Sequence, residues 1–107
     1  MNVYLMHQTG SKLYKIGVSK HVRKRLKENQ TGNGNELEII ATVPSEMPYK
    51  VESLIHRHWQ TKRRVGEWFE LTEEDVNEFE AFCREIENCL NYLQKHNTWV
   101  QSVKRPF

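Results

Sequence analysis

The fold is decided by residues 3–18, which read VYLMHQTGSKLYKIGV. Two runs in this stretch, residues 3–6 and 13–18, are rich in aromatic and β-branched side chains, which favour strands. Between them lies a turn-forming polar run that contains Gly10. Two short strands joined by a short loop are typical of a β-hairpin, so the sequence predicts one here.

A short basic helix and a third strand follow the predicted hairpin. Ser19 is a suitable N-cap for a helix over residues 20–29, in which Val22 and Leu26 lie four residues apart on one face. Most of the other positions in this helix are charged, and four of the five residues 23–27 are Lys or Arg. Residues 37–43, LEIIATV, predict the third strand.

Two more helices are predicted in the second half of the chain. Apolar residues at helical spacing predict a helix over about residues 45–62, and residues 66–71 form a short extended segment. Thr72 and Asp75 resemble a capping box with Asp in place of Glu, and predict the start of a long helix over about residues 72–95. The order of elements predicts an α/β (α+β) fold, with a small three-stranded, mainly antiparallel sheet flanked by helices and a long C-terminal helix.

The long helix carries an apolar stripe whose members are three or four residues apart: Val76, Phe79, Cys83, Ile86, Leu90 and Leu93. Such a stripe is typical of packing against a core, and its length also leaves room for a homodimer or a protein partner. Cys83 and Cys89 lie about 120° apart around the helix axis, so they cannot form a disulfide with each other. Neither belongs to a CxxC pair, and we expect buried thiols in a reducing compartment.

Length and composition limit the classes of protein that the chain can represent. Its 107 residues correspond to one domain, and aromatic residues make up 10% of the chain, too many for a disordered protein. The chain lacks a membrane-length apolar run and a signal-peptide pattern, so we expect a cytoplasmic protein with no membrane contact. Lys and Arg outnumber acidic residues in residues 1–71, and the reverse holds in residues 72–107; this asymmetry suits a polyanionic partner or is ordinary surface charge.

The order and spacing of several short motifs resemble the GIY-YIG nuclease superfamily, in its small phage and bacterial branch whose second motif reads K-I-G. Val3-Tyr4-Leu5 matches the first motif, and Tyr14-Lys15-Ile16-Gly17 matches the second. Arg25 stands at the position of the family's helix arginine, and Glu52 at that of its metal-binding glutamate. Residues 66–69, GEWF, match the close of the branch's domain. The resemblance implies a nuclease domain over residues 1–75, a C-terminal helix over 76–95 and a tail over 96–107.

The resemblance implies hydrolysis of DNA phosphodiester bonds with one divalent ion, Mg²⁺ or Mn²⁺, and with low sequence specificity. Glu52 would bind the ion, because Mg²⁺ accepts a carboxylate oxygen while it keeps most of its waters. Arg25 would bind the phosphate or the leaving oxygen. Tyr4 would orient or deprotonate the water, provided that nearby positive charge lowers the pKa of its hydroxyl. Each of these residues also has an ordinary structural interpretation, as a solvated charge or a packing residue.

Lys15 is the main departure from the superfamily pattern. Adjacent strand residues point to opposite faces, so if the family's second tyrosine faces the site, the residue presented here is Lys15 rather than Tyr14. A lysine can bind the scissile phosphate or hold a tyrosine ionised, but it cannot repeat the hydrogen bonding of a tyrosine. His56 follows Glu52 by one helical turn and is a candidate proton relay, metal neighbour or packing residue.

Several residues are candidates for binding nucleic acid through its backbone phosphates: Lys24, Lys27, Lys62, Arg63 and Arg64. Trp68 and Phe69 can stack on bases, but packing against the second helix is the expected role. His58 is expected in the core. The histidines lack the spacing of a zinc site.

Three functions remain open at the level of the sequence. The first is a metal-dependent DNA endonuclease, with RNA not excluded as a substrate. The second is a nucleic-acid-binding module on the same fold, in which Lys15 has replaced a catalytic tyrosine. The third is an interaction protein, such as a host-directed phage factor, that binds a partner through its acidic C-terminal helix.

Overall fold

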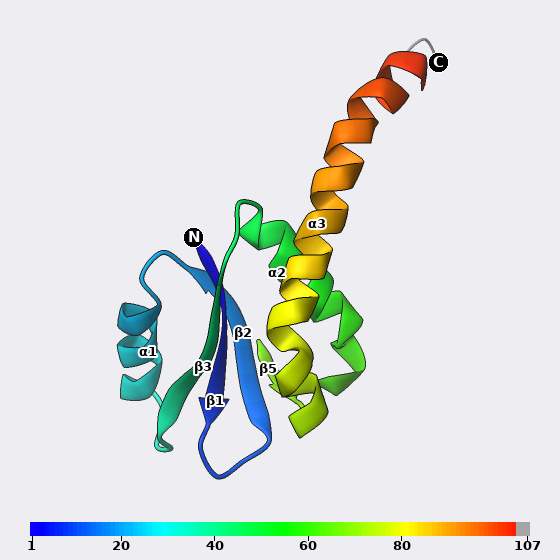
Figure 1. Cartoon of the computed structure of the whole chain (residues 1–107). Helices are drawn as coiled ribbons and strands as arrows, with labels where there is room; N and C mark the ends of the chain where they lie inside the picture. The colour runs from blue at the N-terminus through cyan, green and yellow to red at the C-terminus, as the bar shows by residue number, and fades with distance from the viewer. Residues whose placement is uncertain (105–107) are drawn as a thin grey trace.

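A five-stranded antiparallel sheet lies between one short helix and two longer ones (Figure 1). The computed structural model describes the backbone of residues 1–104 and the side chains of residues 1–95. The elements in chain order are β1 (Asn2–Gln8), β2 (Leu13–Ser19), α1 (Val22–Thr31), β3 (Leu37–Pro44), α2 (Pro48–His58), a 3₁₀ turn (Gln60–Lys62), β4 (Arg63–Val65), β5 (Trp68–Glu70) and α3 (Glu73–Lys104). The strands are arranged in the order β3-β1-β2-β5-β4.

The predicted fold class is confirmed, but the prediction of three strands is wrong. The extra strands, β4 and β5, form a second hairpin whose turn contains Gly66, a residue with a φ of 55° that favours glycine. The stretch 63–65 reads RRV and carries no apolar alternation, so its sequence did not indicate a strand. The hairpin joins the main sheet because β5 pairs with β2 from Leu13 to Lys15.

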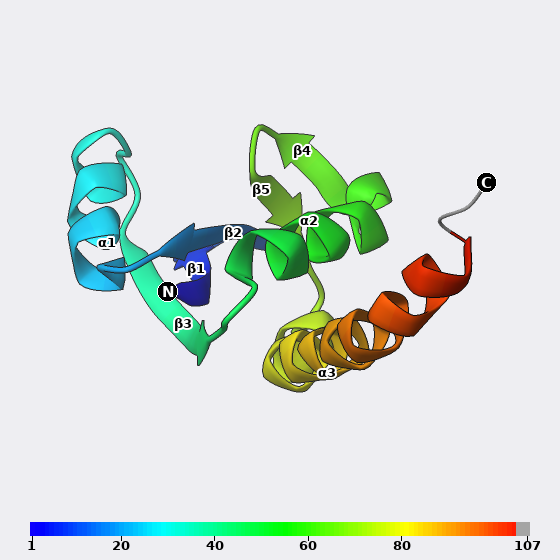
Figure 2. The same cartoon turned by 90° about the horizontal axis from the view of Figure 1, so that it is seen from above.

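Alternation along β1 sends neighbouring side chains into two separate cores. The ribbon shows α1 on one side of β1 and β2, and α2 and α3 on the other (Figures 1 and 2). Val3 and Leu5 point toward α2 and α3, where they join the larger core with Phe69 and Phe79. Tyr4 points the other way, into a smaller cluster under α1, which contains Met6 and Leu37 with Val22, Leu26, Ile39 and Trp68 packed against them. The sheet is therefore covered on both faces, and Tyr4 lies on the face of the basic helix.

The capping box at the start of α3 is confirmed. The Asp75 backbone N–H donates to Thr72 Oγ1 over 3.1 Å, and the Thr72 backbone N–H donates to Asp75 Oδ2 over 3.0 Å. Lys62 Nζ also donates to Asp75 Oδ2 over 2.5 Å. The helix continues to Lys104, beyond the end predicted near Lys95; within the predicted tail, residues 105–107 and the side chains of residues 96–104 lie outside what the structure describes.

The apolar stripe of α3 covers the sheet in its first part. Phe79 and Cys83 are buried, and Ile86 and Leu90 pack against the same core, whereas Leu93 is 59% exposed. This packing accounts for most of the stripe, so the structure does not support the predicted homodimer or protein contact.

Both cysteines are free: burial raises the pKa of Cys83 to about 12, but Cys89 is exposed, contrary to the prediction of two buried thiols. No helix in the part of the chain that the structure describes is both long and apolar enough to cross a membrane.

Both α1 and α2 begin two or three residues later than predicted, because the serines stabilise the turns that precede them. Ser19 Oγ accepts a hydrogen bond from the His21 N–H, and α1 begins at the next residue. Ser45 Oγ accepts one from the Met47 N–H, and Pro48 then occupies the first turn of α2, where a missing N–H does no harm.

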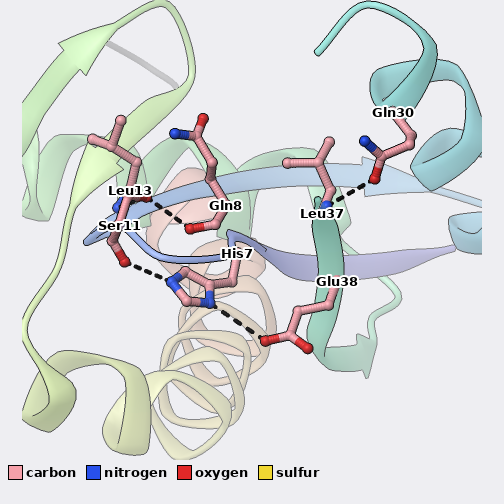
Figure 3. A network of polar contacts seen from close by, with 7 residues as sticks. All are labelled: His7, Gln8, Ser11, Leu13, Gln30, Leu37 and Glu38. Atoms are coloured by element: carbon pink, nitrogen blue, oxygen red, sulfur yellow. Dashed lines mark hydrogen bonds and ion pairs between the residues drawn. The ribbon is translucent and has the colours of Figure 1, made fainter. Parts of the chain in front are cut away.

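A network of side-chain hydrogen bonds fixes the loops at the end of the β1–β2 hairpin (Figure 3). His7 Nε2 donates to the Ser11 carbonyl oxygen over 2.7 Å, and its Nδ1 lies 3.4 Å from Glu38 on β3. The imidazole ring also stacks on Tyr14, with the ring centroids 4.3 Å apart. Nearby, the Leu37 N–H donates to Gln30 Oε1 over 2.8 Å, which ties the end of α1 to the start of β3. His7 is thus a structural residue of the hairpin.

We expect Asp75→Asn to lower stability at neutral pH. Burial raises the pKa of Asp75, but hydrogen bonds from Lys62 and Thr72 outweigh it and leave the pKa below its usual value. A lowered folded-state pKa stabilises the fold above the unfolded pKa of about 3.9, and this contribution is lost as the pH falls through the folded value. Urea titrations at pH 7 and pH 3 should therefore show a larger difference for the natural chain than for Asp75→Asn. Glu74→Gln, an exposed neighbour, is the control; an equal pH response in Asp75→Asn and the natural chain would contradict this prediction.

Candidate active site

A small cavity brings together residues of α1 and α2 with residues of the β1–β2 hairpin. Its volume is about 210 Å³, and its lining consists of Tyr4, Lys15, Gly17, Val18, Arg25, Tyr49, Glu52 and Glu67. Four of these, Tyr4, Lys15, Arg25 and Glu52, are predicted site residues from β1, β2, α1 and α2. The chain thus folds so that these separate motifs meet at one place.

Tyr4 forms the floor of the cavity because its cross-strand partner has no side chain. In the β1–β2 register Tyr4 lies opposite Gly17. A Cβ atom on Gly17 would collide with the Tyr4 hydroxyl and would lie 2.9 Å from Cε2 of the same ring. The glycine of the K-I-G motif is therefore required by the close approach of the tyrosine ring to the backbone.

The Tyr4 hydroxyl is a neutral donor in this environment. Burial raises the pKa of Tyr4 to about 12; Arg25 acts against this change, while Glu67 and Glu52 add to it. The expected deprotonation of water by Tyr4 requires that a cation and neighbouring positive charge lower this pKa, whereas the chain's own groups together raise it. A neutral phenol can still donate a hydrogen bond and orient a water or a phosphate oxygen.

Lys15 faces the cavity and Tyr14 faces the opposite core, as strand alternation predicted. The Lys15 ammonium is held by two acceptors: it donates to Asn29 Oδ1 over 2.8 Å, and it lies 3.7 Å from Glu67 Oε2. Asn29 is oriented in turn, since its Nδ2 donates to the Arg25 carbonyl oxygen over 2.8 Å. One amide side chain thus connects the Lys15 ammonium to the backbone of Arg25 on α1.

Glu52 and Glu67 bring two carboxylates from different elements to the same cavity. Burial, the largest effect, and the nearby Glu67 raise the pKa of Glu52. His56 and Lys15 lower it, but the net change is upward. A nearby cation would stabilise the charged form of Glu52, because its attraction offsets the cost of burial and the repulsion from Glu67. Among the described residues no group of three or more His, Cys, Asp or Glu side chains lies close enough together to hold a metal ion by itself.

His56 lies beside the cavity rather than in its lining. Strand β5 pairs with β2 only as far as Lys15, and His56 Nε2 donates to the next carbonyl oxygen, that of Ile16, over 3.0 Å. Its Nδ1 lies 3.4 Å from Arg63 Nη2. Because a guanidinium can only donate, Nδ1 is the acceptor in this contact. Both ring nitrogens are engaged, so the geometry makes His56 a positioning residue for the face of α2 that carries Glu52.

The predicted phosphate-binding cations divide into two groups. Lys62 is paired with Asp75, Arg63 lies 5.6 Å above the Phe69 ring, and Arg64 is 3.4 Å from Glu70. These three contacts lie within the domain, and none of the three side chains lines the cavity. In contrast, Lys24 and Lys27 are exposed on α1, and no ion pair within the described residues engages them.

The aromatic residues proposed for base stacking are core residues. Phe69 is fully buried in the larger core, while Trp68 packs on the other face, beside Tyr4, and not against the second helix as predicted. His58, predicted in the core, is exposed, with its ring against Trp59 and Phe82. The exposed aromatic residue at the cavity is instead Tyr49, which the sequence analysis missed.

Three residues that the sequence analysis did not select complete the site: Asn29, Tyr49 and Glu67. Helical spacing offered a signal for two of them, because Asn29 follows Arg25 by four residues and Tyr49 precedes Glu52 by three. Glu67 belongs to the quoted GEWF run, but its approach to Lys15 depends on the β4–β5 turn, which the sequence did not indicate.

Fold and site together define a small α/β domain in which cations, carboxylates and a buried tyrosine converge on one cavity. More specifically, the chain matches the T5orf172 domain over residues 1–87 and belongs to that family. This domain occurs in endonuclease-like proteins of phages and bacteria, and it is compatible with a nuclease or a DNA-binding module. No curated protein and no solved structure matches the chain significantly.

We expect Gly17→Ala to destabilise the protein by about 1–3 kcal/mol, because the added methyl group must displace the Tyr4 ring. Gly34→Ala, at a position where an added Cβ meets nothing within 4 Å, is the matched control and should change stability little. The measurement is the free energy of unfolding from urea titration. In a Tyr4→Leu background the same Gly17→Ala change should be less damaging; an unchanged effect would show that the tyrosine is not the obstacle.

Proposed function

We propose that this protein is a metal-dependent endonuclease of the GIY-YIG type that hydrolyses DNA phosphodiester bonds at the Tyr4–Glu52 cavity. The observation that carries the proposal is the convergence of Tyr4, Lys15, Arg25 and Glu52 on one cavity of about 210 Å³. These four residues come from four different elements, β1, β2, α1 and α2. Membership of the T5orf172 family agrees with this activity.

The residues of the cavity fit a hard divalent ion such as Mg²⁺ or Mn²⁺. Mg²⁺ binds through one or two carboxylates and keeps several waters, and Glu52 and Glu67 supply two carboxylates on one cavity. The raised pKa of Glu52 shows that its charged form lacks compensation from the surrounding groups. When bound, the ion supplies a positive charge that polarises the phosphate and makes a coordinated water more acidic.

The chain's own residues divide the remaining work. Arg25 presents a guanidinium fork to the phosphate oxygens, and Lys15 presents an ammonium already held in place by Asn29. Tyr4 donates its hydroxyl proton in a hydrogen bond and orients the attacking water or a phosphate oxygen. Because Asn29 holds the Lys15 ammonium before the substrate arrives, this donor can stabilise charge that develops during the reaction without large rearrangement.

A second candidate function is a nucleic-acid-binding module without cleavage. The observation that favours it is the presence of Lys15 where the GIY-YIG resemblance would place a tyrosine, together with the raised pKa of Tyr4. In this alternative the cavity binds a phosphate, and the same cations contribute to binding affinity but not to cleavage.

We expect Glu52→Gln to abolish cleavage while folding and DNA affinity remain near those of the natural chain, because the change removes a metal-binding charge and leaves the basic surface intact. The assay incubates each protein with single-stranded, duplex and branched DNA, and with RNA, in the presence or absence of Mg²⁺ or Mn²⁺. Glu36→Gln removes an exposed carboxylate outside the cavity and is the control. Unchanged turnover in Glu52→Gln would remove this residue from the mechanism, and a natural chain that binds DNA but never cuts it would favour the binding module.

Arg25 and Lys24, neighbours on α1, should have different effects. Only Arg25 lines the cavity, so Arg25→Ala should reduce turnover by about 10²-fold or more, as expected for loss of a positioned transition-state donor. Lys24→Ala, or Lys27→Ala, should mainly weaken binding and reduce the salt dependence of the affinity by about one unit of slope. Turnover and salt-dependent binding are measured on the same DNA; the reverse pattern would mean that Arg25 is not the catalytic cation.

A further inference from the structure

Tyr49 is a large aromatic residue that takes part in neither core. Its side chain is 63% exposed, although it lines the cavity with Arg25 and Glu52. It lies three residues before Glu52 on α2, so the two side chains share one face of the helix. An exposed ring at the rim of a site lined by cations and carboxylates is available to a ligand.

A bound phosphate at Lys15 and Arg25 would bring a nucleoside to this rim. Of the aromatic residues first considered for stacking, Phe69 is fully buried, and Trp68 is partly buried against the cluster that contains Tyr4 and does not line the cavity. Tyr49 is therefore the aromatic residue of the cavity that can present its ring face to a base. Aromatic side chains bind single strands in this way, because every base has a stacking face.

We propose that Tyr49 is a stacking platform for an unpaired nucleobase next to the phosphate in the cavity, and that the site accordingly takes single-stranded or locally unpaired DNA in preference to duplex. In a duplex the faces of the bases are covered by their neighbours, so a ring can reach a base only after unstacking, which is unfavourable. The inference rests on the proposed function for the location of the phosphate, but it concerns substrate class and binding rather than catalysis.

The test measures binding without cleavage, by fluorescence anisotropy of the full chain with labelled DNA in the presence of EDTA. Tyr49→Leu keeps an apolar side chain of moderate size and removes the ring. It should weaken single-strand binding about five- to a hundredfold and change duplex binding less than twofold. Tyr49→Trp should retain or tighten single-strand binding. Tyr92→Leu, which removes an equally exposed tyrosine (61%) on α3, should alter neither.

A second measurement tests the stacking contact itself. A set of single strands, each with one abasic position, should contain one position at which the natural chain loses affinity and Tyr49→Leu does not. Equal weakening of single-strand and duplex binding in Tyr49→Leu, or abasic effects that are the same in both proteins, would overturn the proposal. A chain that binds DNA through Tyr49 but never cuts it contradicts only the nuclease activity, whereas a chain that binds no DNA contradicts both. Thermal melting of each variant verifies that it is folded.

Discussion

The contact between the Tyr4 ring and the backbone of Gly17 is the constraint on which the site depends. It fixes the β1–β2 register at the point where the hydroxyl must enter the cavity, since a residue with a side chain at position 17 would push the ring away. A slip of one residue would send every side chain of β2 to the other face. Lys15 would then lie on the face of the larger core, away from Asn29 and Glu67, which hold its ammonium.

The incomplete pairing of β2 explains how α2 reaches the cavity from the other side of the sheet. Strand β5 covers β2 only to Lys15, so the following residues have a free edge. His56 satisfies the Ile16 carbonyl oxygen at that edge, and Glu52, one turn earlier on α2, reaches past it to the face of Tyr4. A longer β5 would satisfy the same carbonyl but would separate Glu52 from Arg25.

The sequence was informative where local rules act and uninformative where distant segments meet. Alternation in a strand placed Lys15 and Tyr14 on opposite faces, and the capping pattern of Thr72 and Asp75 located the start of α3. The roles of Glu67 and Lys62 depend on the β4–β5 hairpin and on the 3₁₀ turn before it, which have no clear periodic signal. Charge alone did not reveal that the cations at residues 62–64 have partners within the domain, namely an ion pair for Lys62 and Arg64 and a ring contact for Arg63.

The surroundings of Lys15 suit a lysine. Its side chain is 15% exposed, and a partly desolvated ammonium requires acceptors, which Asn29 on α1 and Glu67 in the β4–β5 turn provide. These acceptors leave part of the ammonium's hydrogen-bonding capacity unused, since a lysine has three N–H donors. The entropy of fixing a long side chain is already lost in the folded state, so a phosphate that enters the cavity meets an oriented cation. We therefore propose that this preorganisation suits Lys15 to bind an anion, and this argument applies equally to the nuclease and to the binding module.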